Sequence, residues 1–373
     1  MWRRVLWASV VLMMLVVAVL GGIGWYYAGQ ILAPGQGGRA RAAITVQAVG
    51  DGTVTLDRTA DTLQPGWYGL RFSDSGFAQV GAIIDEGAAA VTRVLFSAGG
   101  GSPRPGDVVV IESAFYPPEP DMALEEVLLD GELGAFPAYV DRREGDRWAI
   151  LVHGRGGTRR EGFRMRQVLH DLGISSIAVT YRNDEGAPPS PNGLYALGAT
   201  EWRDVVPAVR YALDQGAREL VLVGFSMGGQ IVAQLLHQAA EADRVGAVIL
   251  DAPVLDWRPV LRRAGEDRGL PGFLTDLAMA VAQVRVGISF AALDQVARAD
   301  EFDVPILVFH GTSDSSVPIA TSEAFAAAQP DAVRLVAVSG AEHVRSWNVD
   351  PDGYSRAVAE FLSASGGQRR PGS

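Results

Sequence analysis

The sequence predicts an α/β fold, a mostly parallel sheet with helices on both faces, preceded by a transmembrane helix and a small all-β module. Three observations support this prediction. An apolar stretch without charges fills residues 5–27. Short β-type runs broken by turn sequences fill residues 43–114, and apolar strands alternate with helical stretches over residues 121–365. Such alternation is typical of a sheet wound with crossover helices.

Composition describes a folding chain and excludes several classes of protein. The 373 residues are 48% hydrophobic and 20% charged, which suits one large domain and a smaller one. The net charge of −11 argues against a nucleic-acid partner, because that binding depends on Lys and Arg against phosphate. The chain has no cysteine, so disulfides, thiolate nucleophiles and cysteine-bound metals are excluded.

The N-terminal segment, residues 1–27, predicts a membrane anchor. No charged residue occurs between Arg4 and Arg39, and the apolar stretch is long enough to cross a hydrocarbon layer of ~30 Å at about 1.5 Å per residue. The paired Arg3 and Arg4 predict a single-pass protein of the cell membrane, with the α/β domain of residues 121–365 outside the cytoplasm. A cleaved signal peptide and a buried core helix are the alternatives; a signal peptide's apolar region usually spans only about 7–15 residues.

Several segments predict connections and an accessory domain. Residues 28–42 are small, polar and glycine-rich, as in a flexible linker. Residues 43–114 predict a barrel or sandwich that either spaces the α/β domain from the bilayer or binds an envelope partner. The prolines of "FYPPEP" (115–120) favour an extended linker, and residues 366–373 predict a disordered tail.

The α/β region begins near residue 121 and carries strands that are apolar on both faces, as in a sheet covered on both sides. Helical stretches are expected between them, and residues 256–290 are longer than a crossover needs, which predicts a helical lid. The lid is apolar enough either to cover an acyl group or to pack on the core. The predicted strands are "WAILVH", "SSIAVTY", "ELVLVGFS", "VGAVILD", "VPILVFHG" and "VRLVAVSG".

Ser226 is the candidate nucleophile. It lies in "GFSMG", which matches G-x-S-x-G between a predicted strand and a predicted helix, the context in which this motif exposes a serine hydroxyl. The helix N-terminus also favours developing negative charge. A tight strand-to-helix turn with an incidental serine is the alternative. Because serine alone is a weak nucleophile, it needs a base, and the base needs an orienting acid.

His343 is the candidate base, because it follows the last predicted strand and leaves an acid between itself and the serine, the chain order of this motif. Asp314, in the turn after the penultimate strand, is the candidate acid, with Asp251 as the alternative. The remaining histidines fit less well: two lie in predicted helices and two end strands. They are His170 and His237, and His153 and His310.

The oxyanion donors are expected to be the backbone N–H groups of Arg155, in "HGRGG" after an early strand, and of Met227, which follows the nucleophile. A phosphate loop is the alternative for "HGRGG", but the G-x-x-x-x-G-K-[ST] spacing is absent. The sequence has no H-E-x-x-H pattern, so we predict no metal site. Arg182 and Asp184 are expected to form a loop salt bridge, or Arg182 to meet an anionic substrate.

The motifs "HGRGG", "GFSMGG", "GTSD" and "AEH", in this order at strand ends, resemble the α/β-hydrolase superfamily over residues 121–365. The first two are similar to the branch that joins membrane-anchored serine esterases to prolyl-oligopeptidase-type catalytic domains. The resemblance implies Ser226 as nucleophile, Asp314 as acid, His343 as base and no cofactor.

We therefore expect a serine hydrolase that cleaves a small acyl substrate, an ester or thioester, through an acyl-enzyme. The lipid bilayer would be contacted through the N-terminal helix. The alternatives are a serine peptidase acting on short peptides, an acyltransferase, and a non-catalytic envelope-binding protein. The β module is too short for the propeller of the oligopeptidases, which weighs against the peptidase.

Overall fold

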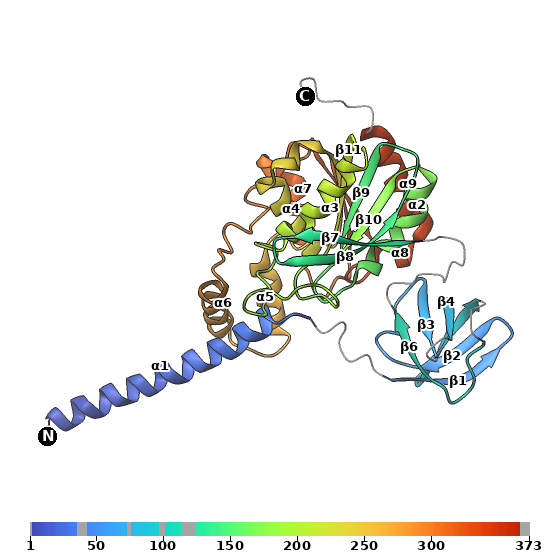
Figure 1. The fold of residues 1–373 in the computed structure, drawn as a ribbon. Helices are drawn as coiled ribbons and strands as arrows, with labels where there is room; N and C mark the ends of the chain where they lie inside the picture. Colours follow the sequence, from blue (N-terminus) through green and yellow to red (C-terminus); the bar gives the residue numbers. More distant parts are fainter. Residues whose placement is uncertain (1, 36–42, 73–75, 97–100, 113–123, 366–373) are drawn as a thin grey trace.

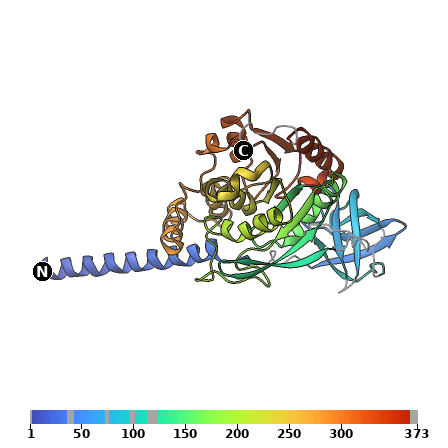
Figure 2. The ribbon, with the colours of Figure 1, turned by 45° about the horizontal axis from the view of Figure 1, so that its top comes forward.

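The computed structural model describes residues 2–35, 43–72, 76–96, 101–112 and 124–365. A long N-terminal helix, α1 (Trp2–Leu32), and a β barrel leave the larger catalytic domain on opposite sides (Figures 1 and 2). The predicted linker 115–120 and tail 366–373 lie outside the described residues.

Helix α1 is long and apolar enough to cross a membrane, with a mean hydropathy of 2.5 in its most apolar window. It continues to Leu32, so the predicted linker 28–42 is wrong for its first five residues; residues 36–42 lie outside the described part. Gly24, Ala28 and Leu32 are buried, whereas most of the helix before them is exposed. Because these residues recur every fourth position, they form one face, and that face packs on the catalytic domain.

The all-β module is a closed barrel with the strand order β1-β2-β5-β4-β3-β6. Alternate residues of each strand point inward, and Val54, Leu56 and Val80 are among the fully buried ones. Its strands are β1 (Ile44–Gly50), β2 (Thr53–Asp57), β3 (Tyr68–Arg71), β4 (Phe77–Glu86), β5 (Ala90–Phe96) and β6 (Val108–Glu112).

The catalytic domain is built on an eight-stranded sheet in the order β14-β13-β12-β11-β9-β10-β8-β7. The strands from β9 onward are parallel, and the antiparallel hairpin β7–β8, which was not among the predicted strands, extends the β10 edge. The strands are β7 (Glu125–Gly131), β8 (Gly134–Asp141), β9 (Arg147–Val152), β10 (Ser175–Val179), β11 (Glu219–Phe225), β12 (Val245–Asp251), β13 (Ile306–Gly311) and β14 (Val333–Val338).

Two hydrophobic cores lie on the two faces of this sheet, as the strands' continuous apolar runs predict. Helices α3 (Trp202–Asp214), α4 (Met227–Gln238) and α7 (Ala320–Ala328) cover one face, and α2 (Arg166–Asp171) and α9 (Pro351–Ser365) cover the other. The insertion at 256–290 contains α5 (Trp257–Glu266) and α6 (Gly272–Val286). Shorter elements are η1 (Arg159–Met165), η2 (Ala240–Arg244), η3 (Ala299–Glu301) and α8 (Ser346–Val349).

The barrel docks on the catalytic domain at α8. Trp67 N–H donates to the carbonyl of Asn348 at 2.8 Å, and the Asn348 amide donates back to the carbonyl of Trp67 at 2.7 Å. A Cβ on Gly66 would lie 2.1 Å from the Asn348 carbonyl oxygen, so the barrel approaches closely only because this residue is glycine. Arg345, in the same contact, lies over the ring of Tyr68.

Candidate active site

Ser226 lies on a strained turn between β11 and α4. Its backbone has a φ of 51° and a ψ of −117°, a conformation that non-glycine residues rarely adopt. The flanking glycines are required by close approach. A Cβ on Gly224 would lie 2.7 Å from the backbone of Gly228, and a Cβ on Gly228 would lie 2.1 Å from the carbonyl oxygen of Val152. The turn therefore presses α4 against the end of β9 and leaves the serine side chain at the sheet's carboxyl edge.

The three side chains singled out in the sequence form one hydrogen-bonded chain. The Ser226 hydroxyl lies 2.8 Å from Nε2 of His343, and Nδ1 of the same imidazole lies 2.7 Å from Oδ2 of Asp314. His343 comes from the loop after β14 and Asp314 from the turn after β13. Parallel strands end at the same edge of a sheet, so residues distant in sequence meet there.

Asp314 is held as a carboxylate. Its Oδ1 accepts hydrogen bonds from the backbone N–H groups of Ser316 and Val317, both at 2.8 Å. Burial works against the charge, but hydrogen bonds from His310 and His343 prevail and hold the pKa of Asp314 below its ordinary value.

His343 has a raised pKa for the complementary reason. Burial disfavours the imidazolium, but the hydrogen bond and the charge of Asp314 outweigh it and raise the pKa of His343 above its ordinary value. Such an imidazole is a stronger base than an isolated one and can hold a proton taken from Ser226.

His310 is a contact of the acid that the sequence analysis missed. Its Nε2 lies 3.3 Å from Oδ2 of Asp314 and 3.0 Å from the Val317 carbonyl oxygen, while its Nδ1 lies 2.7 Å from Oγ of Ser322. The only signal was its position at a strand end, four residues before Asp314. The imidazole is buried and contacts Oδ2 of Asp314, the same oxygen that His343 contacts.

Asp251, the alternative acid, takes another place. Its carboxylate is buried and accepts a hydrogen bond from Oγ of Ser346 at 3.1 Å, and no hydrogen bond joins it to His343 in the part of the chain that the structure describes. Burial raises its pKa to about 6. Its backbone carbonyl supports the nucleophile turn by accepting the Ser226 N–H at 3.0 Å.

The "HGRGG" loop lies directly beside the serine, because a Cβ on Gly154 would be 3.0 Å from Cβ of Ser226. The carbonyl of Gly154 accepts the Gly157 N–H and the Tyr181 hydroxyl, both at 2.9 Å, and the His153 Nδ1–H at 2.8 Å. These bonds fix the peptide that joins Gly154 to Arg155. Within the described residues, neither Arg155 N–H nor Met227 N–H has an acceptor, so both can donate to a ligand.

The end of α1 closes over the same loop. The Arg155 guanidinium donates to the carbonyl oxygens of Gln30 at 3.0 Å and Ala33 at 2.8 Å. The Tyr195 N–H donates to the Leu32 carbonyl at 2.8 Å. The predicted anchor is therefore continuous with the catalytic domain instead of joined to it by a flexible tether.

The expected pair of Arg182 with Asp184 is wrong. Arg182 forms a buried two-bond contact with Asp204, at 2.7 and 2.8 Å, and so does not face a substrate. Asp184 instead lies 2.8 Å from Nε2 of His153, and its charge, opposing the effect of burial, raises the pKa of that imidazole. Asp184 and His153 together brace the loop before Arg155.

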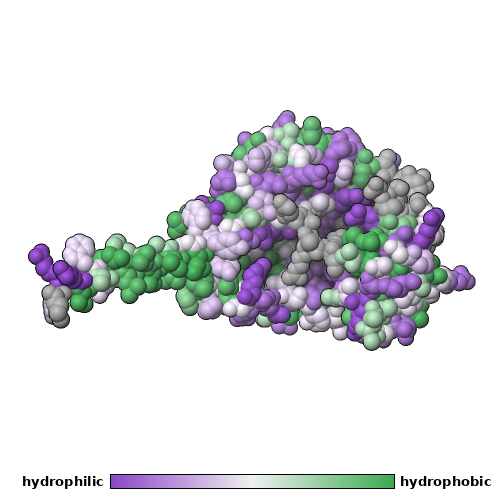
Figure 3. Space-filling model, turned by 90° about the horizontal axis from the view of Figure 1, so that it is seen from below, coloured by the Kyte–Doolittle hydropathy of each residue, from purple (hydrophilic) through white to green (hydrophobic). Residues whose placement is uncertain are grey.

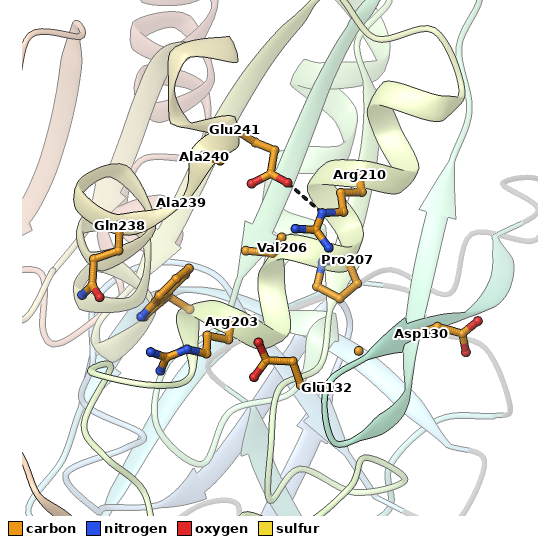
Figure 4. Close-up of a pocket in the computed structure, with 12 residues that line it drawn as sticks. Asp130, Glu132, Arg203, Val206, Pro207, Arg210, Gln238, Ala239, Ala240 and Glu241 are labelled. Atoms are coloured by element: carbon orange, nitrogen blue, oxygen red, sulfur yellow. Dashed lines mark hydrogen bonds and ion pairs between the residues drawn. The ribbon is translucent and has the colours of Figure 1, made fainter.

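The described ranges hold no metal site, and the cavity found there lies away from Ser226. No group of three His, Cys, Asp or Glu side chains there could hold a metal ion. A cavity of about 360 Å³ lies between the β7–β8 hairpin, α3 and the end of α4, crossed by the Arg210–Glu241 ion pair at 2.7 Å (Figure 4). None of Ser226, His343 or Asp314 lines it.

Comparison with known proteins agrees with this architecture. Residues 45–112 match a domain of unknown function (DUF8805), and residues 149–357 match the family described as "Alpha/beta hydrolase family". Two curated relatives are uncharacterized proteins. YfhR of Escherichia coli K12 is 23% identical over 57% of this chain and 69% of its own length. A protein of Mycobacterium tuberculosis H37Rv is 29% identical over 58% of this chain and 69% of its own length.

Among solved structures, an esterase of Pyrococcus furiosus superposes with a TM-score of 0.53 at 18% identity, covering 65% of this chain and 92% of that one. A likeness at this identity shows the fold alone. The match to the family itself spans more than half of the chain and contains the serine turn, the acid and the histidine. The chain belongs to the alpha/beta hydrolase family of enzymes.

Proposed function

We propose that the protein is a serine hydrolase that cleaves carboxylic esters or thioesters through an acyl-enzyme. The observation that carries this proposal is the hydrogen-bonded chain from Ser226 through His343 to Asp314 at the strained turn. Its order and contacts are those of a nucleophile, a base and an orienting acid. A solved structure of the same fold is an esterase, so an ester is the first substrate class to test.

In the first half of the reaction, Oγ of Ser226 bonds to the acyl carbon while Nε2 of His343 takes the hydroxyl proton. Asp314 stabilises the resulting imidazolium. The N–H groups of Arg155 and Met227 donate to the oxyanion; losing one such donor typically costs about 10²–10³ in rate. The tetrahedral intermediate then releases the alcohol or thiol, which receives the proton from His343.

In the second half, water attacks the acyl carbon and gives its proton to His343. The bond to Oγ of Ser226 breaks, the serine regains its proton, and the carboxylic acid leaves. An alcohol that replaces water would make the protein an acyltransferase, and a peptide in place of the ester would make it a peptidase. The site residues would be the same in each case.

A fluorescent fluorophosphonate tests the nucleophile, because it bonds only to an activated serine. We expect the full chain in detergent to be labelled, Ser226→Ala to lose all labelling, and His343→Ala to be labelled far more slowly. Ser339→Ala, an exposed serine outside the site, is the matched control and should be labelled like the parent. An unlabelled, folded parent would rule out the proposal.

Substrate choice follows from a second set of assays. p-Nitrophenyl esters of increasing chain length should be hydrolysed faster than a peptide p-nitroanilide. An added alcohol acceptor should give little transfer product. Faster cleavage of the anilide would favour the peptidase, and dominant transfer would favour the acyltransferase.

We also propose that α1 spans the cell membrane once, with Arg3 and Arg4 in the cytoplasm and the catalytic domain outside. Its length, hydropathy and flanking arginines support this. The cysteine-free sequence allows a direct test. An exposed Leu128→Cys on β7 should react with a membrane-impermeant maleimide in intact cells. Reaction only after lysis would reverse the orientation.

A further inference from the structure

Helix α6 exposes apolar side chains that the catalytic domain does not cover. Phe273 and Val284 are 61% and 86% exposed. The opposite side of the helix is also apolar, with Ala278, Met279 and Ala282 buried. The exposed side also carries Asp276, paired with Arg262. An exposed apolar strip beside charged groups suits a helix at the boundary between lipid and water.

The contact between α6 and α1 shows at what depth α6 lies. A Cβ on Gly24 would be 3.0 Å from Cγ of Leu277 and 3.2 Å from Cγ2 of Val281, so the two helices pack closely there. A hydrocarbon layer of ~30 Å takes about 20 helical residues, which, counted from Arg4, end at about residue 24. Helix α6 therefore meets α1 where α1 leaves the hydrocarbon layer.

The residues that follow on α1 agree with this level. Trp25 and Tyr26 are 57% and 61% exposed, and such aromatic side chains are typical of the boundary between lipid and water. The Arg285 guanidinium of α6 lies 4.2 Å from the centre of the Trp25 ring and donates to the Trp25 carbonyl at 3.3 Å. A basic side chain at this level can reach lipid headgroups.

The apolar surface of α1 runs up to the body of the molecule, and α6 lies beside the helix where it enters (Figures 1 and 3). Once α1 is in a bilayer, the exposed side of α6 cannot stay far from lipid, because the two helices are packed together. A soluble partner on this surface would have to displace headgroups.

We propose that α6 is an interfacial helix that seats the catalytic domain on the bilayer and gives the active site access to esters held in the membrane. This inference rests on the proposed hydrolase function and on α1 as its anchor. The oxyanion loop supports the second half. Arg155 binds Ala33, which lies eight residues beyond Trp25, or about 12 Å along a helix. An amphiphilic ester that stays partly in the bilayer is the substrate class that such a site reaches.

Site-directed spin labelling measures directly whether α6 lies at the bilayer surface. Single labels are possible because the chain has no cysteine of its own. Phe273→Cys and Val284→Cys would each be labelled in the full chain, with one copy per phosphatidylcholine–phosphatidylglycerol nanodisc. Leu15→Cys in α1 is the membrane reference, and Leu128→Cys, 68% exposed on β7, is the matched aqueous control. We expect the α6 labels to collide more often with oxygen and less often with a polar nickel complex than the Leu128 label does.

Two results would overturn the seat. One is equal accessibility of the α6 and Leu128 labels to both relaxants. The other combines two observations: the α6 labels show spin–spin broadening only when each disc holds two copies, and under that condition they also lose contact with oxygen. That result would assign the surface to a second copy of this chain. A Leu15 label without membrane accessibility would instead contradict the anchor, while fluorophosphonate labelling of the same samples reports separately on Ser226.

The substrate half has its own assay in the same nanodiscs. We expect Phe273→Asp with Val284→Asp to lower hydrolysis of p-nitrophenyl palmitate held in the disc by at least tenfold, and to leave hydrolysis of soluble p-nitrophenyl acetate within twofold. Leu128→Asp should change neither rate. Equal losses on both esters would mean that α6 acts only on the fold, and unchanged rates on both would mean that it has no part in substrate access; either result overturns this half.

Discussion

The guanidinium of Arg155 donates a hydrogen bond to the carbonyl oxygen of Ala33 at 2.8 Å, and a second to that of Gln30 at 3.0 Å. The last carbonyls of a helix lack intrahelical donors and carry partial negative charge, so a cation there is favourable. The residue whose N–H we assign to the oxyanion thus has its side chain anchored on the end of α1. Helix α1, which we propose as the membrane anchor, therefore also supports this loop beside Ser226.

Replacing Arg155 with Ala should therefore slow the reaction more than it weakens substrate binding. We expect kcat to fall about 10- to 100-fold, the size of loss typical when an outer contact that orients a metal ligand is removed. Arg155→Lys should recover part of it, because an ammonium supplies the charge and the donors but ends one bond short of Nη2, the nitrogen that makes both contacts. Steady-state kinetics on a soluble ester measures this, with Arg203→Ala as control. A raised KM with unchanged kcat would contradict the assigned role.

Affinity for a boronic acid that mimics the tetrahedral intermediate gives a second measurement on Arg155. If the arginine positions an oxyanion donor, binding of the boronic acid should weaken by the same factor as kcat/KM falls. Binding of the carboxylic acid product should change little. Equal weakening of both ligands would instead indicate a general loosening of the site.

The pH dependence should reveal the coupling of His343 to Asp314. The reaction needs the neutral imidazole, so kcat/KM should rise with pH through an inflection above the ordinary histidine value of 6.5. In Asp314→Asn the charge that raises this pKa is gone while burial remains, so the inflection should move to lower pH and the plateau should drop by orders of magnitude. Glu342→Gln should shift the inflection far less. An unmoved inflection in Asp314→Asn would contradict the pairing.

The same pair has opposite effects on stability at the two ends of the pH range. The raised pKa of His343 means that its contribution to the free energy of unfolding is fully present below about pH 6.5. That contribution is lost as pH rises through the pKa of the folded state. The lowered pKa of Asp314 means that its contribution is present above its unfolded value of 3.8 and is lost as pH falls through the folded one.

Sequence alone could predict that Ser226, Asp314 and His343 come together, because each follows a strand with a local signature and the chain order restricts the choice. It could not identify His310 as a contact of Asp314, or Asp204 as the partner of Arg182. Both depend on which elements the fold brings together, because His310 lies on β13 and Asp204 on α3. The docking of residues 28–35 was also hidden, because a short run of small residues looks the same whether it packs on a domain or lies in water.

Gly228→Ala tests the close approach at the serine turn. The added methyl would meet the Val152 carbonyl oxygen at 2.1 Å, so β9 and α4 must separate. Overpacking in a core typically destabilises a protein by about 1–3 kcal/mol, and backbone atoms shift out of the way less readily than side chains do. We expect a lower melting temperature and lost labelling of Ser226. Gly272→Ala, with nothing within 4 Å of the added atom, should melt within a degree or two of the parent. Equal melting of both variants would contradict the close packing.

Arg93→Met tests how the barrel holds its docking loop. The buried guanidinium donates to the carbonyl oxygens of Gly81, Thr62, Gln64 and Gly66 at 2.6–2.9 Å, and Gly66 lies against the Asn348 carbonyl. A buried carbonyl left without a donor costs about 1–3 kcal/mol. We expect faster hydrogen exchange in the amides of residues 62–68 and of α8.

The control for Arg93 is Arg71→Met, because that arginine is half exposed and binds Glu112 on the barrel surface. A surface ion pair contributes about 0–1 kcal/mol, so exchange in the docking loop should be unchanged. Faster exchange only within the barrel in Arg93→Met, with α8 unaffected, would show that the loop docks without help from Arg93.

The starting residue of a shortened chain should decide whether the catalytic domain is stable and active. A chain of residues 24–373 keeps the buried Ala28 and Leu32, while a chain of residues 43–373 lacks them and both carbonyl acceptors of Arg155. Losing a buried leucine alone costs about 2–5 kcal/mol. We therefore expect the 43–373 chain to melt at least several degrees lower and to react with fluorophosphonate more slowly.

Leu32→Ala in the 24–373 chain separates packing from the Arg155 contact. The backbone acceptors remain, so this variant should lose stability and keep most of its rate of labelling at a temperature where it is folded. Arg155→Ala in the same chain should show the reverse, a slow reaction in a protein of nearly parental stability. If the 24–373 and 43–373 chains proved equally stable and equally reactive, α1 would be an anchor only, and its end would contribute nothing to the catalytic loop.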